Sequence, residues 1–295
     1  MTDSPSHVQK KRPAPLRQEH ATKQRDRVHR VLPVTRSALA VELTRFAERL
    51  ADESRSMLHR AAGKRPKINI KPDASFVTKA DRAIETRLRD LIEQTYPGHG
   101  ILGEEYGSRD LDAEFVWVLD PIDGTAPFIA GIPVYGTLIG LAYGGAPWIG
   151  VIDHPATGDR WVGVSGDFSR HNGTVIRTQR CANLDTAFLT NSNPDFFSQH
   201  EYRAFARLRQ AVRYTQYGGS CFAYGVLASG RTDLAVDGGL NPFDVFAPAA
   251  VIAGAGGIVT DWSGGELDLT KSGTIIAAGD ESLHAQALLV LSAEY

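Results

Sequence analysis

The stretch Trp117-Val118-Leu119-Asp120-Pro121-Ile122-Asp123-Gly124-Thr125 delivers two carboxylates and a hydroxyl directly after an apolar run. Proline disfavours helix for the residue before it, so we expect Asp120 to end a strand and Pro121 to set a turn. Gly124 permits close approach of the backbone, and Thr125 can begin a helix whose free N–H groups suit a phosphate. The two aspartates and the Ile122 carbonyl are hard oxygen ligands, which Mg²⁺ prefers. The stretch therefore predicts a cation beside a phosphate-binding turn. The alternative, an ordinary surface turn, fits poorly after five apolar residues.

The composition excludes several classes of protein. The 295 residues are 42% hydrophobic and can bury a substantial core, as one large domain or as two lobes. A formal charge of −2 gives no sign of a nucleic-acid partner. Two cysteines can form neither a disulfide framework nor a cysteine zinc site, which fits a reducing compartment, so we expect a cytoplasmic protein. No apolar run approaches the roughly 20 residues of a membrane span, so no membrane partner is expected.

The first 34 residues differ in composition from the rest of the chain. Residues 1–30 contain eight Lys/Arg against three Asp/Glu, and no apolar segment of a secretory signal is present. We predict a disordered basic N-terminal tail over residues 1–34. A solvated extension without a set role is the simplest interpretation, and a transit peptide or an interaction tail is the functional alternative.

The remaining chain divides by the order of its expected elements. Apolar residues at helical spacing predict helices over residues 36–62 and 78–96. Strand-like runs follow, with a hairpin at Gly144-Gly145. Strands and helices alternate in the second half. We therefore predict an α+β lobe over residues 35–155, carrying most of the metal ligands, and an α/β lobe over residues 156–295.

Three further acidic segments lie next to expected strands or helix starts. Glu104 follows a short apolar run in Gly103-Glu104-Glu105, and Asp244 lies where a helix should begin. Asp81 closes the polar segment Lys71–Asp81 at the start of another helix. Each has an ordinary alternative. Adjacent glutamates usually face solvent, an N-cap aspartate contributes about 1 kcal/mol to helix stability, and an acidic residue is favourable in a first turn.

Together these segments resemble the inositol monophosphatase superfamily of Mg²⁺-dependent phosphomonoesterases, over about residues 36–291. The Asp120–Thr125 sequence carries most of the resemblance, with the late Asp244 followed by alanines and Gly256-Gly257. Within the superfamily, the chain is most similar to the histidinol-phosphate phosphatase branch, through the segments around Asp81, Glu104 and Asp244. The resemblance implies a layered αβαβα sandwich that combines α+β and α/β character, and a homodimer.

The resemblance also implies a ligand set for two or three Mg²⁺ ions. Glu104, Asp120 and the Ile122 carbonyl would hold the first ion. Asp120, Asp123 and Asp244 would hold the second, and a third, weaker ion would bind near Glu104 through waters. Closely packed carboxylates raise one another's pKa values and repel, and divalent cations remove that cost.

The remaining implied roles concern water, phosphate and substrate. Asp81 would pair with the Thr125 hydroxyl, and with Glu104 they form the expected catalytic set. Asp123, Gly124 and Thr125 would bind phosphate. Five residues match the substrate-side positions: Gly219, Ser220, Cys221, Asp237 and Asp244.

The resemblance is incomplete at one substrate position, because Ala126 follows Thr125 where the branch often has arginine. We predict hydrolysis of a small-molecule phosphate ester, L-histidinol phosphate, as a step of histidine biosynthesis. Inositol-1-phosphate or another polyol or sugar phosphate is the alternative substrate. A catalytically silent binding protein on the same scaffold is the alternative class; a broken ligand set would favour it, and the set here is complete.

Overall fold

The structure is a computed structural model that describes residues 33–62, 68–70 and 76–293. The predicted tail falls outside these ranges up to residue 32, as do residues 71–75 of the polar segment before Asp81. The chain forms two units, one ending at Val41 and one beginning at Glu42. All site residues belong to the second unit. None of the described helices combines the length and apolar character that crossing a bilayer requires.

Two long helices precede the first large sheet. Helix α2 (Pro33–Ala61) begins two residues inside the predicted tail and buries Leu43, Leu50 and Leu58 at helical spacing. Helix α3 (Lys79–Thr95) starts with a capping box, in which Thr78 is the N-cap and the Asp81 side chain accepts a hydrogen bond from the Thr78 N–H. Its buried apolar face, which includes Leu88, packs on the sheet. The hairpin of β1 (Ile68–Ile70) and β2 (Phe76–Thr78) lies between the helices in sequence.

An eight-stranded sheet follows in the described part of the chain, in the order β10-β9-β8-β7-β6-β5-β3-β4. Neighbouring strands are antiparallel except β3 and β5, which are parallel. The predicted hairpin at Gly144-Gly145 joins β6 to β7. The strands are β3 (Gly100–Gly103), β4 (Gly107–Arg109), β5 (Phe115–Asp123), β6 (Gly136–Tyr143), β7 (Ala146–His154), β8 (Asp159–Val164), β9 (Phe168–His171) and β10 (Thr174–Ile176).

Strand β5 does not end at Asp120 as the sequence suggested. It continues to Asp123, and its pairing with β6 shifts register between Asp120 and Asp123. This irregularity accommodates Pro121, which has no N–H to donate to a ladder. The irregularity therefore replaces the expected turn.

The second, five-stranded sheet has the order β12-β11-β13-β15-β14. Its strands are β11 (Phe188–Asn191), β12 (Tyr214–Tyr217), β13 (Leu234–Leu240), β14 (Ile258–Thr260) and β15 (Gly273–Ala278). Helices α5 (Gln199–Ala211) and α8 (Glu281–Leu291) pack together on its outer side, over a core that includes Phe205 and Leu283. Strand β15, which pairs with both β13 and β14, was not predicted, although residues 274–278 are largely apolar.

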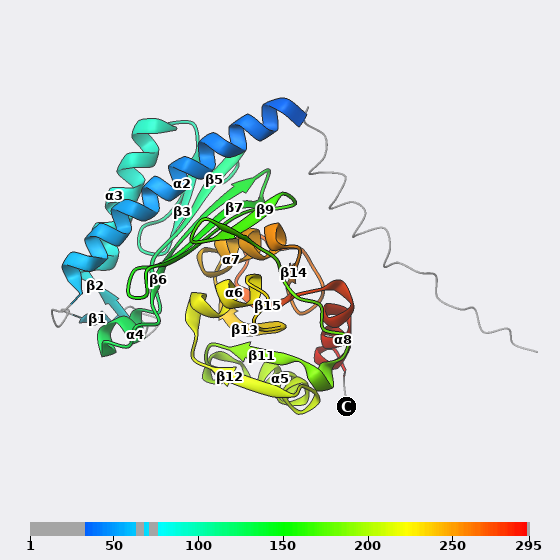
Figure 1. Ribbon diagram of the computed structural model, residues 1–295. Helices are drawn as coiled ribbons and strands as arrows, with labels where there is room; N and C mark the ends of the chain where they lie inside the picture. Colours follow the sequence, from blue (N-terminus) through cyan, green and yellow to red (C-terminus); the bar gives the residue numbers. More distant parts are fainter. Residues whose placement is uncertain (1–32, 63–67, 71–75, 294–295) are drawn as a thin grey trace, which may run out of the picture. The chain divides into compact units, whose positions relative to one another are not determined.

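Helices α6 (Ser220–Ala228) and α7 (Pro242–Ala255) lie between the two sheets, as Figure 1 shows. The close contact of α7 with the first sheet depends on small residues, because a Cβ on Gly150 would lie 2.2 Å from the Ala247 carbonyl oxygen. Within residues 42–295 the layers therefore run helix, sheet, helix, sheet, helix, which confirms the predicted αβαβα sandwich. Strands β8 to β10 extend the first sheet past residue 155, so both predicted lobes contribute to it; the division into lobes stays a prediction.

Candidate active site

Three aspartates meet at one end of the first sheet. Asp120 and Asp123 come from the irregular end of β5, and Asp244 comes from the first turn of α7. One carboxylate oxygen from each lies within 4.8 Å of the others. Residues 120 and 244 are far apart in sequence, so only the layered fold brings them together. The structure thus assembles three of the four carboxylates predicted as metal ligands.

The main chain holds each of the three carboxylates by an N–H donor. The Ile122 N–H donates to Asp120 Oδ1 at 3.0 Å. The Cys221 N–H, in the first turn of α6, donates to Asp123 Oδ2 at 2.7 Å. The Asn241 N–H donates to Asp244 Oδ2 at 2.7 Å, which makes Asp244 the third residue of a capping box rather than the N-cap. Backbone donors fix the orientation of a carboxylate without adding a charged side chain.

The fourth predicted carboxylate, Glu104, follows β3. Strands β3 and β5 are parallel, with Gly103 opposite Leu119, and the Glu104 N–H donates to the Leu119 carbonyl at 3.2 Å. Glu104 therefore leaves the sheet beside Asp120.

The electrostatics of the cluster fit a bound cation. Burial raises the pKa of Asp120 well above its usual value, and the charges of Glu104, Asp123 and Asp244 raise it further. Burial also raises the pKa of Asp123, and the hydrogen bond from the Cys221 N–H lowers it. Closely packed, buried carboxylates are costly unless something positive offsets them. With the Ile122 carbonyl, they offer the oxygen donors that a hard divalent ion takes.

The predicted phosphate residues lie directly against the predicted substrate residues. Gly124 has φ +79°, and a Cβ there would lie 2.7 Å from the Val134 carbonyl oxygen and 3.1 Å from Ser220 Oγ. Thr125 begins α4 (Thr125–Ala130), as expected, and its hydroxyl donates to the Ile122 carbonyl at 3.1 Å. Gly219 is the N-cap of α6. The starts of α4 and α6 therefore meet beside Asp123.

Asp81 does not form the predicted hydrogen bond with Thr125 in this structure. Its Oδ2 accepts from the Thr78 N–H at 2.8 Å and from the Thr78 hydroxyl at 2.6 Å. Its Oδ1 is buried and has no hydrogen-bond partner among the described residues. Burial raises the pKa of Asp81, and the bonds from Thr78 oppose this. A buried acceptor without a donor costs free energy, so Oδ1 is suited to accept a hydrogen bond from a group that enters the site.

Asp237, on β13, is enclosed by hydrogen-bond donors. Tyr224 donates its hydroxyl at 2.6 Å, the Ser192 N–H donates at 2.7 Å and the Asn191 side chain at 2.9 Å. Only 2% of Asp237 is exposed, and burial raises its pKa to about 6. Both carboxylate oxygens accept hydrogen bonds from these groups, so Asp237 belongs to a buried hydrogen-bond network within the protein. Sequence reasoning missed Tyr224 as a hydrogen-bond donor to Asp237. The only available signal was its position four residues after Ser220, on the same face of α6.

Sequence reasoning also missed Glu85, a fully buried residue of α3. Its carboxylate accepts hydrogen bonds from the N–H groups of Glu105 and Tyr106, directly after Glu104. The available signal was its position four residues after Asp81, which places both acids on one face of the helix.

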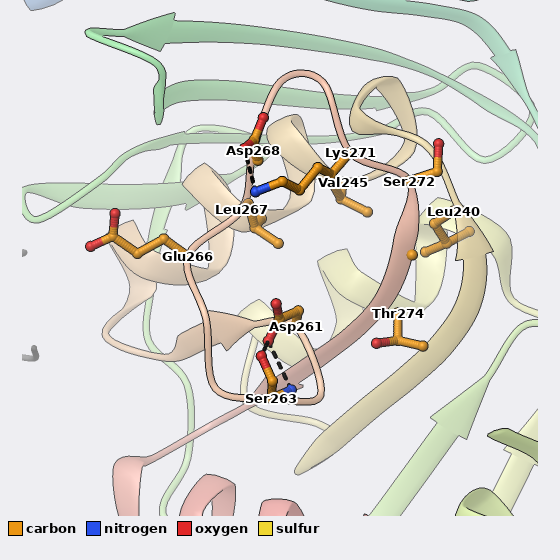
Figure 2. Close-up of a pocket in the computed structure, with 11 residues that line it drawn as sticks. Leu240, Val245, Asp261, Ser263, Glu266, Leu267, Asp268, Lys271, Ser272 and Thr274 are labelled. Atoms are coloured by element: carbon orange, nitrogen blue, oxygen red, sulfur yellow. Dashed lines mark hydrogen bonds and ion pairs between the residues drawn. The ribbon is translucent and has the colours of Figure 1, made fainter. Parts of the chain in front are cut away.

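A separate cavity of about 250 Å³ lies between the end of β13 and the segment over residues 261–274 (Figure 2). Leu240, Val245 and Leu267 supply apolar lining, and an Asp268–Lys271 ion pair of 2.9 Å is among its polar groups. None of the predicted site residues lines this cavity, although Val245 follows Asp244. The cavity and the aspartate cluster are therefore distinct features.

Comparison with known proteins decides the family. The family model described as the inositol monophosphatase family matches residues 39–293. The chain belongs to the inositol monophosphatase family. This confirms the resemblance and the predicted enzyme class, because the family and its relatives are phosphatases. The chain is 43% identical over 259 residues to the bifunctional phosphatase IMPL2, chloroplastic, of Arabidopsis thaliana, covering 84% of this chain and 75% of the relative.

Two further relatives belong to the same comparison. The histidinol-phosphatase of Mycobacterium tuberculosis is 33% identical over 204 residues, covering 67% of this chain and 78% of the relative. The solved inositol monophosphatase of Zymomonas mobilis is 40% identical, with a TM-score of 0.79, and the match covers 86% of this chain and 99% of that one. The inositol monophosphatase fold is thereby confirmed.

Proposed function

We propose that this family member is a Mg²⁺-dependent phosphomonoesterase that hydrolyses L-histidinol phosphate to L-histidinol and phosphate. The observation that carries the metal-dependent chemistry is the meeting of Asp120, Asp123 and Asp244 within 4.8 Å. The similarity to the histidinol-phosphatase of M. tuberculosis supports the substrate.

In this proposal, five residues would hold two or three Mg²⁺ ions: Glu104, Asp120, Ile122 through its carbonyl, Asp123 and Asp244. When bound, Mg²⁺ lowers the pKa of a coordinated water and neutralises charge on the phosphate oxygens. The N–H donors from Ile122, Cys221 and Asn241 keep the three aspartates pointed at one place before the ester arrives. This preorganisation reduces the reorientation that the reaction requires.

The chain's own groups bind and orient the ester. The N–H groups of Gly124 and Thr125, at the start of α4, are proposed to bind the phosphate. Ser220 and Cys221 approach the same place from the start of α6. The buried Oδ1 of Asp81 has no hydrogen-bond partner among the described residues, which supports a role as a hydrogen-bond acceptor in the site. The donor would be either the attacking water or the Thr125 hydroxyl, once that hydroxyl rotates away from the Ile122 carbonyl.

The alternative substrate is inositol-1-phosphate or another polyol phosphate, which the similarity to the Z. mobilis inositol monophosphatase favours. Ala126 takes the position where the histidinol-phosphate branch often has arginine, so one substrate contact of that branch is missing. A homodimer and a cytoplasmic location remain proposals beside the substrate, as does a role in histidine biosynthesis.

A substrate panel tests the proposal. Phosphate release is measured from histidinol phosphate, inositol-1-phosphate and a generic phosphomonoester, each with Mg²⁺ and with EDTA. We expect the highest kcat/KM for histidinol phosphate and none in EDTA. A higher value for inositol-1-phosphate would favour the alternative substrate, and no turnover of any ester would favour a silent binding protein. Asp120→Asn is expected to abolish Mg²⁺-dependent release.

A further inference from the structure

The turn that carries Glu104 is attached to helix α3 through one buried carboxylate. Glu85 is fully buried, and its Oε2 accepts a hydrogen bond of 2.7 Å from the Glu105 N–H. Its Oε1 accepts from the Tyr106 N–H at 3.2 Å. Both donors belong to the two residues that follow Glu104, so the carboxylate binds the turn by its backbone.

Arg89 compensates the buried charge of Glu85. Its Nε donates to Glu85 Oε1 at 2.8 Å, one helical turn away on α3. The same guanidinium donates to the Gly107 carbonyl, so the pair contacts the turn at both its N–H and its carbonyl groups. A lone carboxylate here would add repulsion to the acidic cluster, whereas the Glu85–Arg89 pair has no net charge.

The fit of this pair against the turn is close. A Cβ on Gly103 would lie 2.0 Å from Glu85 Oε1, so any side chain at residue 103 would displace the carboxylate. Glu104 is therefore flanked on both sides by residues that lie against Glu85. Its own N–H is held by the Leu119 carbonyl of β5.

We propose that Glu85, with Arg89, is a positioning residue that holds the Glu104 turn in its metal-binding geometry before any cation is present. The inference rests on the proposed function, because it assigns Glu104 to the metal. A turn that is free to move in the metal-free protein must be ordered when the cation binds, and this ordering costs conformational entropy. The Glu85 anchor opposes that movement, so less of the metal-binding free energy is spent on ordering the turn.

Glu85→Gln tests the proposal, since the amide keeps the shape of the side chain but presents an NH₂ to donors. The matched control is Glu201→Gln, because Glu201 also accepts a backbone N–H, from Ser198, at the start of α5 and away from the site. Hydrogen bonds to charged groups stabilise the folded state more than neutral ones do. We therefore expect amide hydrogen exchange at Glu105 and Tyr106, measured in EDTA, to accelerate about tenfold or more in Glu85→Gln. We expect the Kd for Mn²⁺, measured by electron paramagnetic resonance, to rise by about the same factor.

The activity should show the same pattern. In Glu85→Gln the Mg²⁺ concentration for half-maximal activity should rise about tenfold, while kcat at saturating Mg²⁺ stays within about threefold of the wild type. Gly103→Ala keeps Glu85 and Arg89 in the sequence but would displace the Glu85 carboxylate, so it should shift the Mn²⁺ Kd in the same direction. It covers the case in which Glu85→Gln does not fold. Glu201→Gln should leave all three measurements unchanged.

Three results would overturn the inference. The first is unchanged Mn²⁺ affinity in Glu85→Gln, and the second is a Glu201→Gln variant that loses Mn²⁺ affinity equally. The third needs no variant and is unprotected Glu105 and Tyr106 amides in the metal-free wild type. Wild-type activity that does not change with Mg²⁺ or EDTA would instead contradict the proposed function. Failure of the inference and failure of the proposed function are therefore distinguishable.

Discussion

The main-chain N–H of Cys221 donates a hydrogen bond of 2.7 Å to Asp123 Oδ2, across 98 residues of sequence. This backbone hydrogen bond joins the start of α6 to the end of β5. Burial raises the pKa of Asp123, and this N–H is the first contribution that lowers it. The position of α6 therefore influences the charge of a predicted metal ligand.

The thiol of Cys221 should resist modification in the folded protein. The side chain is buried, and burial, followed by the nearby Asp123 charge, raises its pKa well above the usual range. Because the thiolate is the reactive form, we expect Cys221 to react at least about a hundredfold more slowly than the half-buried Cys181. Timed labelling with a thiol reagent, followed by peptide mass analysis, measures both rates in one sample. Equal rates for the two cysteines would contradict this prediction.

Mg²⁺ should stabilise the protein through the aspartate cluster. At a concentration of 100 times Kd, a bound ion adds about 2.7 kcal/mol to the free energy of unfolding. Asp120→Asn should raise the Tm of the metal-free protein, because it removes a buried charge that its neighbours repel, and it should remove most of the Mg²⁺-induced increase. Scanning calorimetry with Mg²⁺ and with EDTA measures both effects.

The control for this variant is Asp261→Asn in the separate cavity of Figure 2, where Asp261 accepts hydrogen bonds from the Ser263 and Gly265 backbone. This change should lower Tm equally in both buffers. The assignment of Asp120 as a metal ligand fails if Asp120→Asn keeps the full Mg²⁺-induced increase in Tm.

Gly124→Ala and Gly131→Ala should differ in cost although both positions have positive φ, +79° and +76°. A left-handed conformation costs an alanine about 1–2 kcal/mol wherever it occurs. At Gly131 nothing lies within 4 Å of the added Cβ, so only this cost applies. At Gly124 the Cβ would also meet the Val134 carbonyl at 2.7 Å, so we expect about 1–3 kcal/mol more. Urea unfolding measures the difference, and equal losses would show that the turn relaxes freely.

The stability of the metal-free protein should fall as pH rises through the range of Asp237. Burial raises the pKa of this carboxyl from 3.8 to about 6, so the folded state binds its proton more tightly than the unfolded chain. The resulting stabilisation is fully present below about pH 3.8 and is lost by about pH 6, with an upper limit of about 3 kcal/mol.

Tyr224→Phe should move the upper end of this pH window higher, because the Tyr224 hydroxyl bond lowers the pKa of Asp237. Denaturant unfolding in EDTA at several pH values gives the profile. Tyr202→Phe, on the exposed side of α5, is the matched control. If the two variants have the same pH profile, Asp237 is not the group that titrates.

Much of the fold followed from local patterns in the chain. The hairpin at Gly144-Gly145, the Thr78 start of α3 and the Thr125 start of α4 were all predicted, because capping and turn residues act on their immediate neighbours. The strand end at Asp120 was wrong. Whether Pro121 ends a strand or lies in an irregular one depends on the pairing with β6, which local sequence does not contain.

The sequence by itself determined the family and named Asp120, Asp123 and Asp244 as candidate ligands, because residue types at short spacing specify the donor chemistry. Only the tertiary structure decided that these three oxygens meet, that Cys221 donates its backbone N–H to Asp123, and that Glu85 accepts a hydrogen bond from the turn after Glu104. The physical reason is that these contacts join elements separated along the chain, and their distances are set by the packing of α7 and α3 on the first sheet.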